Sequence, residues 1–265
     1  RQGGILVKMF ETRASAPLNI IKKKCQPSPF TPGRLRLNKQ LNTRIRDIFE
    51  GAKSNSGRRL MNYENLMTVM RRLALEAGDV IMDIYETNDF SVNVKSDNSP
   101  VTAADEAADQ LISAGLRAAF PNVALVTEEQ SASHGARADV FLIVDPLDGT
   151  REFIHRRGDF TVNIAYIEHG VPTRGIVYAP AKGRLFYTLA NGRSVEEIGE
   201  FDKNQAAPTQ PIRVNQADNT ALMVVASKSH RDRQTDAYIE KYAVKDMKSA
   251  GSSLKFCLIA TGEAD

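Results

Sequence analysis

Residues 139–150 decide the fold, and they read Asp-Val-Phe-Leu-Ile-Val-Asp-Pro-Leu-Asp-Gly-Thr. Val140 to Val144 is an unbroken run of large apolar residues, which predicts a strand that is buried on both faces. The strand is expected to stop at Pro146, which cannot donate to a sheet ladder and lies between the carboxylates of Asp145 and Asp148. Because acids at the tip of a buried strand are costly unless they are compensated, this stretch requires a positive partner.

Residues 145–150 allow two interpretations when they are taken alone. The first is a plain turn, because Pro followed by Asp-Gly is common turn chemistry. The second is a site for a hard cation, in which the carboxylates of Asp145 and Asp148 and the carbonyl of Leu147 supply oxygen ligands, and the next backbone amides face a phosphate. Gly149 would let the chain pass close to such a ligand.

A third acidic position favours the cation site. The apolar run Val123 to Val126 predicts another strand, and Thr127-Glu128-Glu129 follows it directly. If the ends of the two strands lie together in the sheet, Glu128 comes beside Asp145. Ligands that are all oxygen, without sulfur or clustered imidazole, favour Mg²⁺, with Mn²⁺ as a substitute.

These residues resemble a known family, the lithium-sensitive, Mg²⁺-dependent phosphomonoesterases that include inositol monophosphatase and 3'(2'),5'-bisphosphate nucleotidase. The resemblance rests on Glu128-Glu129, on Asp-Pro-Leu-Asp-Gly-Thr at 145–150 and on outlying motifs, and it runs from Asn62 to the last residue. It implies an α/β fold, an α+β layered sandwich in which helices alternate with mixed and antiparallel sheets. It also implies a small phosphorylated substrate and two or three Mg²⁺ ions.

Outside this stretch, apolar periodicity predicts two helices. From Leu66 to Ile84 apolar residues recur at spacings of three and four, which indicates one long helix with a buried stripe, although Gly78 lies inside it. Residues 90–95 alternate as a strand would. Thr102 is expected to cap a second helix, with Asp105 in the capping-box position. The buried face of that helix is expected to comprise Ala108, Leu111, Ile112, Leu116 and Ala119.

Beyond Thr150 the sequence predicts an antiparallel meander. Three short β-type runs, at residues 160–167, 175–178 and 185–189, are separated by turn residues. The motif Arg151-Glu152-Phe153 precedes them. In the resembling family, bisphosphate nucleotidases carry a basic residue followed by Glu-Phe at this place, whereas inositol monophosphatases usually have Thr-Asn-Phe. The resemblance therefore favours a nucleotidase.

A second α/β layer is expected from Gln210 onward. We predict strands at residues 212–214 and 221–226 and a helix at residues 231–243. Residues 251–255, Gly-Ser-Ser-Leu-Lys, read as a flexible glycine and an N-cap that introduce a further helix.

The domain organisation follows from the resemblance. It implies a leader at residues 1–60, a metal-binding α+β subdomain at residues 61–205 and, at residues 206–265, the start of a C-terminal α/β subdomain. In the family a further strand and a Trp-Asp motif come later, and the aspartate of that motif completes the second metal site. Asp265 does not match it. We therefore expect a C-terminally truncated member with an incomplete second layer, an exposed sheet edge and a second ion that binds weakly.

Charge is divided unevenly along the 265 residues, whose net charge is +3. Residues 1–60 hold 14 Lys/Arg and 3 Asp/Glu, and the remainder holds 21 and 29, so a leader of +11 precedes a body of −8. We expect the leader to be disordered or cloning-derived, with no catalytic role. The alternatives are an organelle-targeting peptide and an arm that binds nucleic acid weakly.

The amino-acid composition and the absence of certain motifs exclude several other functional classes. With 42% apolar residues the chain can bury a sizeable core. No apolar run reaches the roughly 18 residues of a membrane span, so a soluble, cytoplasmic protein without membrane partners is expected. Cys25 and Cys257 lie too far apart in the sequence to suggest a disulfide framework or a Cys-based zinc site. Motifs for a P-loop, a dinucleotide-binding loop, a zinc protease and a serine-hydrolase elbow are absent from the sequence. The oligomeric state is not determined by the sequence.

The resemblance also implies roles for single residues. Asp105 and Thr150 match the pair that orients and deprotonates the attacking water, although the residues alone would let Asp105 simply complement the helix N-terminus. Lys95 matches a lysine near that water, with a solvated strand end as the alternative. The amides of Gly149 and Thr150 are expected to bind phosphate oxygens. The positions that match the nucleotide end of the pocket are His230, Ser252 and Lys255.

Together these roles predict hydrolysis of a phosphomonoester by metal-activated water. One ion is expected to be held by Glu128, Asp145 and the Leu147 carbonyl. Glu128 is also predicted to be a catalytic residue. A second ion is expected at Asp145 and Asp148. The expected reaction removes the 3'-phosphate of adenosine 3',5'-bisphosphate, and of its sulfated form. The alternatives are an inositol monophosphatase and an inactive member that only binds anionic ligands.

Overall fold

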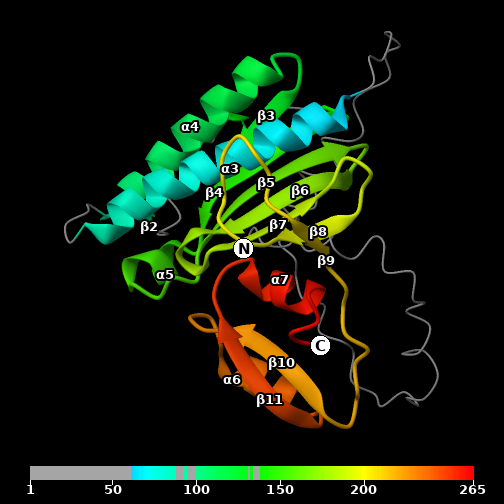
Figure 1. The fold of residues 1–265 in the computed structure, drawn as a ribbon. Coiled ribbons are helices and arrows are strands. Elements are labelled where there is room, and N and C mark those ends of the chain that lie inside the picture. Colours follow the sequence, from blue (N-terminus) through cyan, green and yellow to red (C-terminus); the bar gives the residue numbers. More distant parts are fainter. Residues whose placement is uncertain (1–60, 88–91, 95–99, 131, 134–137) are drawn as a thin grey trace.

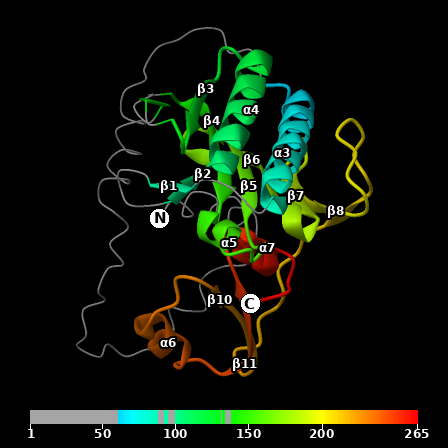
Figure 2. The ribbon, with the colours of Figure 1, turned by 90° about the vertical axis from the view of Figure 1, so that its left-hand side faces the viewer.

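The structure, a computed structural model, describes residues 61–87, 92–94, 100–130, 132–133 and 138–265. Two long helices, α3 (Tyr63–Glu86) and α4 (Ala103–Ala119), lie side by side and cover one face of a seven-stranded sheet, as Figures 1 and 2 show. A smaller sheet lies below it in Figure 1. The layered α/β class that the sequence predicts is confirmed.

The large sheet has the strand order β3-β4-β5-β6-β7-β8-β9. Its strands are β3 (Ala124–Thr127), β4 (Val140–Asp148), β5 (Thr161–Glu168), β6 (Val171–Ala179), β7 (Arg184–Thr188), β8 (Ser194–Glu197) and β9 (Thr209–Pro211). Only the pair β3–β4 is parallel. The predicted meander of three strands is confirmed as β5 to β7, and two short strands that we did not predict follow it. Before the sheet, β1 (Val92–Val94) and β2 (Pro100–Thr102) form an antiparallel pair.

The smaller sheet pairs β10 (Leu222–Ser227) with β11 (Val244–Ala250) in parallel, and α6 (Arg233–Ile239) connects them. The strand predicted at residues 212–214 is wrong. The residues that pair with β8 in the large sheet come just before it, at Thr209–Pro211, and form β9. The predicted helix at residues 231–243 is too long. Asp232 caps α6 by accepting from Thr235 N at 2.8 Å, and the chain then continues into the parallel strand β11. The division at residues 205 and 206 remains a prediction.

Strand β4 differs from its prediction in length and burial. It runs through Pro146 to Asp148, with a register shift between Asp145 and Asp148. The proline lies in this irregular segment, where its missing N–H costs no regular ladder bond. Leu142 and Val144 are buried, whereas Val140, Phe141 and Ile143 are only partly covered. The prediction that both faces of this strand are buried was therefore wrong. Helix α4 covers one face, and the other face is less protected.

Both helices bury the apolar stripes that the periodicity indicated, with two differences. Leu66, Met70, Leu73, Ala77 and Ile81 are buried on α3, and Ala108, Ile112 and Leu116 are buried on α4. Ala119 is exposed instead, as the last residue of its helix, and Leu111 is only partly buried. Gly78 lies where β6 approaches α3, because a Cβ there would overlap the ring of Tyr178. This close approach offsets the roughly 1 kcal/mol of helix propensity that glycine costs.

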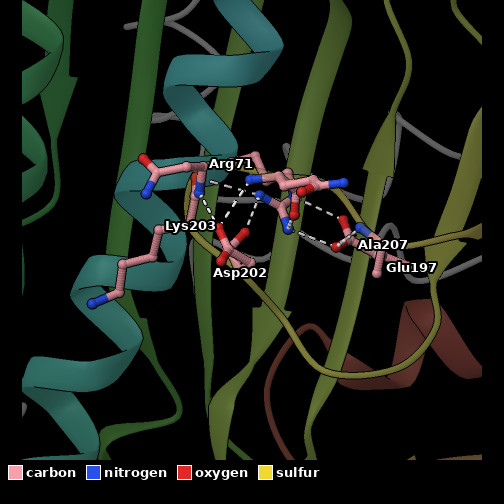
Figure 3. A network of polar contacts seen from close by, with 7 residues as sticks. Arg71, Glu197, Asp202, Lys203 and Ala207 are labelled. Atoms are coloured by element: carbon pink, nitrogen blue, oxygen red, sulfur yellow. Dashed lines mark hydrogen bonds and ion pairs between the residues drawn. The ribbon is translucent and has the colours of Figure 1, made fainter.

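A buried ion pair joins α3 to the end of β8, and the same arginine also contacts the loop between β8 and β9 (Figure 3). Arg71 donates from Nε and Nη2 to the two carboxylate oxygens of Glu197, at 2.7 and 2.6 Å, and from Nη1 to the carbonyl of Asp202 at 2.7 Å. Glu197 also accepts from the backbone amide of Ala207 at 2.8 Å, and Lys203 in the same loop pairs with Asp79. Arg71 and Glu197 are 6% and 2% exposed, so this bidentate pair is shielded from solvent.

Replacing Arg71 tests how strongly this pair holds the loop. Arg71→Ala leaves the Glu197 carboxylate buried without its cation, and we expect the free energy of unfolding to fall by about 3–5 kcal/mol. The matched control is Arg72→Ala, which removes the adjacent arginine from its partly exposed pair with Glu76 and should cost at most about 1 kcal/mol. Urea unfolding measures both variants. Equal losses in the two would contradict the assignment.

Candidate active site

The parallel pair β3–β4 brings together the acids that follow each strand. Thr127 lies opposite Val144, and the amide of Glu128 donates to the Val144 carbonyl at 3.0 Å. Glu128 is thereby carried to the level of Asp145, close enough for its charge to raise the pKa of Asp145. The sequence predicted that Glu128 would lie beside Asp145 if the ends of the two strands lay together. The observed register places the strand ends together.

Negative charge is concentrated at this edge. Desolvation raises the pKa of Asp145 well above its usual range, and the charges of Asp148, Glu128 and Asp105 raise it further. Desolvation also raises the pKa of Asp148, although Lys255 and the backbone amide of Ser253 oppose the rise. In the buried side chain of Asp145, Oδ1 has no hydrogen-bond partner. Repelling carboxylates and an unsatisfied oxygen acceptor fit a divalent cation, which would satisfy both.

The acids are near one another without forming a finished coordination shell. Among the residues that the structure describes, no three Asp, Glu, His or Cys side chains already converge as metal ligands. Leu147 is buried beside Asp145 and Asp148, and its carbonyl oxygen lies 3.3 Å from the hydroxyl oxygen of Thr150. Binding a cation here therefore requires the carboxylates to turn toward it, and the direction of each side chain matters.

Asp105 and Thr150 meet as the resemblance implied. One carboxylate oxygen of Asp105 accepts from the amide and the hydroxyl of Thr102, at 2.8 and 2.6 Å, and so completes the capping box of α4. The other oxygen accepts from the Thr150 hydroxyl at 3.1 Å. Asp105 is only 1% exposed. The helix cap and the predicted catalytic pair thus share Asp105, because each uses a different oxygen of its carboxylate.

Two glycines let the layers approach each other at this point. Gly149 has φ 97°, and a Cβ there would lie 3.0 Å from the carbonyl of Asp159 and 3.1 Å from Cβ of Ser252. A short helix, α5 (Thr150–Ile154), starts directly after it. A Cβ on Gly251 would lie 2.7 Å from the same Asp159 carbonyl. Our interpretation of Gly251 as a flexible spacer was therefore wrong, since this residue is glycine for close packing.

The N-cap predicted within residues 251–255 is Ser253, which precedes α7 (Leu254–Ala260) and makes no side-chain capping hydrogen bond. Its hydroxyl instead lies 2.7 Å from Thr161 Oγ1 and donates to Asn163 Oδ1, also at 2.7 Å. Its backbone amide donates to Asp148 Oδ2 at 2.6 Å. Sequence reasoning missed Thr161 and Asn163. Their signal was two polar residues at alternate positions of an otherwise apolar strand, which places both on one face.

The remaining predicted residues lie around this edge, except for one. Lys255 donates to the Ser252 carbonyl at 2.7 Å and is partly buried; desolvation lowers its pKa, against the opposing charges of Asp148, Glu152 and Asp159. His230 is exposed, and its Nε2 lies 3.2 Å from Nη1 of Arg151. Because a guanidinium only donates, Nε2 accepts in this contact. Lys95 lies outside the described residues.

Residues 62–265 match the sequence profile of the inositol monophosphatase family. The chain belongs to this family. Family membership makes it a phosphatase and confirms the resemblance. The 3'(2'),5'-bisphosphate nucleotidase CysQ of Escherichia coli strain K12 is 43% identical over 197 residues, which are 73% of this chain and 76% of the relative. CysQ of Buchnera aphidicola is 37% identical over 205 residues, which are 76% of this chain and 74% of the relative.

Solved structures of the family have the same architecture. CysQ from Bacteroides thetaiotaomicron aligns with a TM-score of 0.64 at 33% identity, over 77% of this chain and 79% of that chain. An IMPase from Thermotoga maritima aligns with the same TM-score at 24% identity, over 76% and 74% of the two chains, and this likeness shows the fold alone. None of the helices in the described ranges is both long and apolar enough for a membrane span.

The predicted role of the Asp105–Thr150 contact can be tested with a substitution that keeps the size of the Thr150 side chain. Thr150→Val keeps the shape of the side chain and removes the hydroxyl, so we expect phosphatase turnover to fall by about 10²-fold, the scale of losing a positioned proton-transfer group. Thr150→Ser retains the hydroxyl and should stay within about tenfold of the unmodified chain. Steady-state phosphate release measures both. If valine and serine gave the same turnover, the hydroxyl would have no catalytic role.

Proposed function

We propose that this phosphatase is an Mg²⁺-dependent nucleotidase, which removes the 3'-phosphate of adenosine 3',5'-bisphosphate and of its sulfated form. The observation that carries the proposal is the proximity of Glu128, Asp145 and Asp148 at one edge, where Oδ1 of Asp145 is buried without a hydrogen-bond partner. The substrate is supported by the name of the relatives and by the motif Arg151-Glu152-Phe153 at the start of α5.

The donor set suits a hard cation. The carboxylates of Glu128, Asp145 and Asp148 and the carbonyl of Leu147 would hold two or three Mg²⁺ ions, for which Mn²⁺ can substitute. When bound, the metal supplies positive charge that polarises the phosphate and makes a water more acidic. Without that charge, the three acids repel one another at close range, as the raised pKa values of Asp145 and Asp148 indicate.

Asp105 and Thr150 supply a route for the proton of the attacking water. The Thr150 hydroxyl donates to Asp105 Oδ1, so its lone pairs remain available to accept a hydrogen bond from a water that faces the phosphate. As the water oxygen bonds to phosphorus, the bond from phosphorus to the 3'-oxygen breaks. The water proton can pass to Thr150 while the Thr150 proton moves to Asp105, and the leaving 3'-oxygen takes up a proton from solvent. The capping box holds Asp105 in place for this transfer.

The groups that we propose to bind the substrate lie near the acids that follow β3 and β4. The amides of Gly149 and Thr150 supply donors for phosphate oxygens, where charge accumulates during the reaction. Ser252 and Lys255 come from the second layer, which the close contacts at Gly149 hold against the first. With His230 on the adjoining loop, they are assigned to the nucleotide end. Lys95 remains assigned to the attacking water.

Asp148→Asn tests the ligand assignment, since it keeps the shape and removes a charge. We expect turnover at saturating substrate to fall by about 10²-fold or more. Asp79→Asn is the matched control, because this acid lies on the surface and pairs with Lys203 away from the site. Release of inorganic phosphate is measured with Mg²⁺ and with a chelator. Normal Mg²⁺-dependent turnover in Asp148→Asn would exclude Asp148 from the site.

Substrate preference is tested by side-by-side assays. We expect a higher kcat/KM for adenosine 3',5'-bisphosphate than for inositol 1-phosphate, with adenosine 5'-monophosphate as the product. Chromatography of the products identifies which phosphate has left. A preference for inositol 1-phosphate would replace the proposal by an inositol monophosphatase. Binding of either compound without metal-dependent phosphate release would instead indicate a member that only binds anions.

A further inference from the structure

Helix α4 carries a polar stripe of which the proposed function uses only the first residue, Asp105. Asp105, Asp109, Ser113 and Arg117 follow one another at intervals of four residues, so they lie on one face of the helix. Asp109 and Ser113 are 3% and 1% exposed in a helix whose other buried side chains, apart from Asp105, are apolar. Apolar residues at these two places would be buried at lower cost, so the polar groups need an explanation.

The partner of the stripe is the side chain of Gln130. Its Nε2 donates to Asp109 Oδ2 at 2.6 Å and to Ser113 Oγ at 3.2 Å, and its Oε1 accepts from Nη2 of Arg117 at 2.7 Å. The amide thus has an anion at its donor end and a cation at its acceptor end. Charge-assisted hydrogen bonds at both ends fix the amide in one orientation.

Gln130 ends the turn that carries Glu128. Its backbone amide donates to Thr127 Oγ1 at 3.1 Å, and its carbonyl accepts from the Ser133 hydroxyl at 2.6 Å. The amide of Thr127 donates to Ser133 Oγ at 3.0 Å, while Glu128 is bonded to Val144 through its own amide. The turn is therefore held on one side by the sheet and on the other side by α4, through Gln130.

We infer that Asp109, Ser113 and Arg117 act through Gln130 to position Glu128 for the divalent cation. The inference rests on the proposed function, because it concerns the same cation site. Glu128 lies near the carboxylates of Asp145 and Asp148, and repulsion between these charges opposes its position there. The contacts of Gln130 keep the turn in place against this repulsion. These four are positioning residues, because they act through Glu128 and do not touch the substrate.

The first test uses the metal-free full chain. In Gln130→Ala, we expect hydrogen exchange at the amides of Glu128 and Gln130 to accelerate about tenfold, since a net hydrogen bond or two is lost. The amides of α3 should be unchanged. Asp109→Ala should have the same effect as Gln130→Ala, and the double variant should add little to either one. Asp109→Asn retains an oxygen acceptor for Gln130 and should be closer to the unmodified chain.

The second test measures Mg²⁺ dependence of thermal stability and of turnover. We expect the Mg²⁺ concentration for half-maximal stabilisation to rise about tenfold in Gln130→Ala, while kcat at saturating Mg²⁺ stays within about threefold. Arg71→Ala is the control for general destabilisation, because its contacts are with Glu197 at the end of β8 and with the loop that follows. It should lower the melting temperature without changing the Mg²⁺ concentration required.

The outcomes separate the inference from the proposed function. Unchanged exchange and unchanged Mg²⁺ dependence in Gln130→Ala would overturn the inference and leave the proposed function standing. If the unmodified chain shows neither Mg²⁺-dependent phosphate release nor stabilisation by Mg²⁺, the proposed function fails, and the inference fails with it. Gln130 is in a partly exposed turn, so this variant decides the question even if Asp109→Ala does not fold.

Discussion

The parallel pairing of β3 with β4 sets up an electrostatic conflict that shapes the rest of the molecule. In this register Glu128 lies beside Asp145, and Asp148 follows on the same strand. Carboxylates this close repel one another, and taking them out of water increases the cost. The strand pairing is stable because its apolar residues pack beneath α4, and the acids at the strand ends are carried along with them. A cation resolves the conflict, which is why the arrangement suits a metal-dependent phosphatase.

Helix α4 stabilises this edge from one side. Its capping box fixes Asp105, whose second oxygen is thereby directed at Thr150 in the loop after β4. The positive end of the helix dipole also favours the negative charge that accumulates there. Further along the helix, the polar stripe reaches the turn after β3 through Gln130. One helix therefore contacts the segments that follow both strands of the parallel pair.

The second layer completes the edge from the other side. Its last described helix, α7, packs Leu254 and Cys257 against Val177, Ala179 and Phe186 of the large sheet. This packing brings the amide of Ser253 to Asp148 and the side chain of Lys255 near the same carboxylate. Close approach at Gly149 and Gly251 makes the contact possible. A positive side chain and a donor amide thus reach the acids from about a hundred residues further along the chain.

Predictions from local sequence were correct wherever the apolar residues followed a single helical or strand spacing. The helical stripe of α3, the capping box of α4 and the three strands of the meander were all predicted, because apolar spacing and turn residues act over short distances. The predictions failed where a distant segment decided the outcome. Strand β4 continues through Pro146 because β5 pairs with both sides of the irregularity. Strand β11 has little apolar alternation and depends on β10 for its pairing. The hydroxyl of Ser253 does not cap α7, because Thr161 and Asn163 are its buried partners instead.

The sequence by itself determined the chemistry: which acids could act as ligands, which strands carry them, and the family to which the motifs belong. These properties follow from residue types and from short-range spacing. The tertiary structure alone decided the register that places Glu128 beside Asp145, the docking of Ser253 on Asp148, and the use of the polar stripe on α4. These contacts join segments that are far apart in the sequence, and they form only when the apolar faces of several elements are buried together.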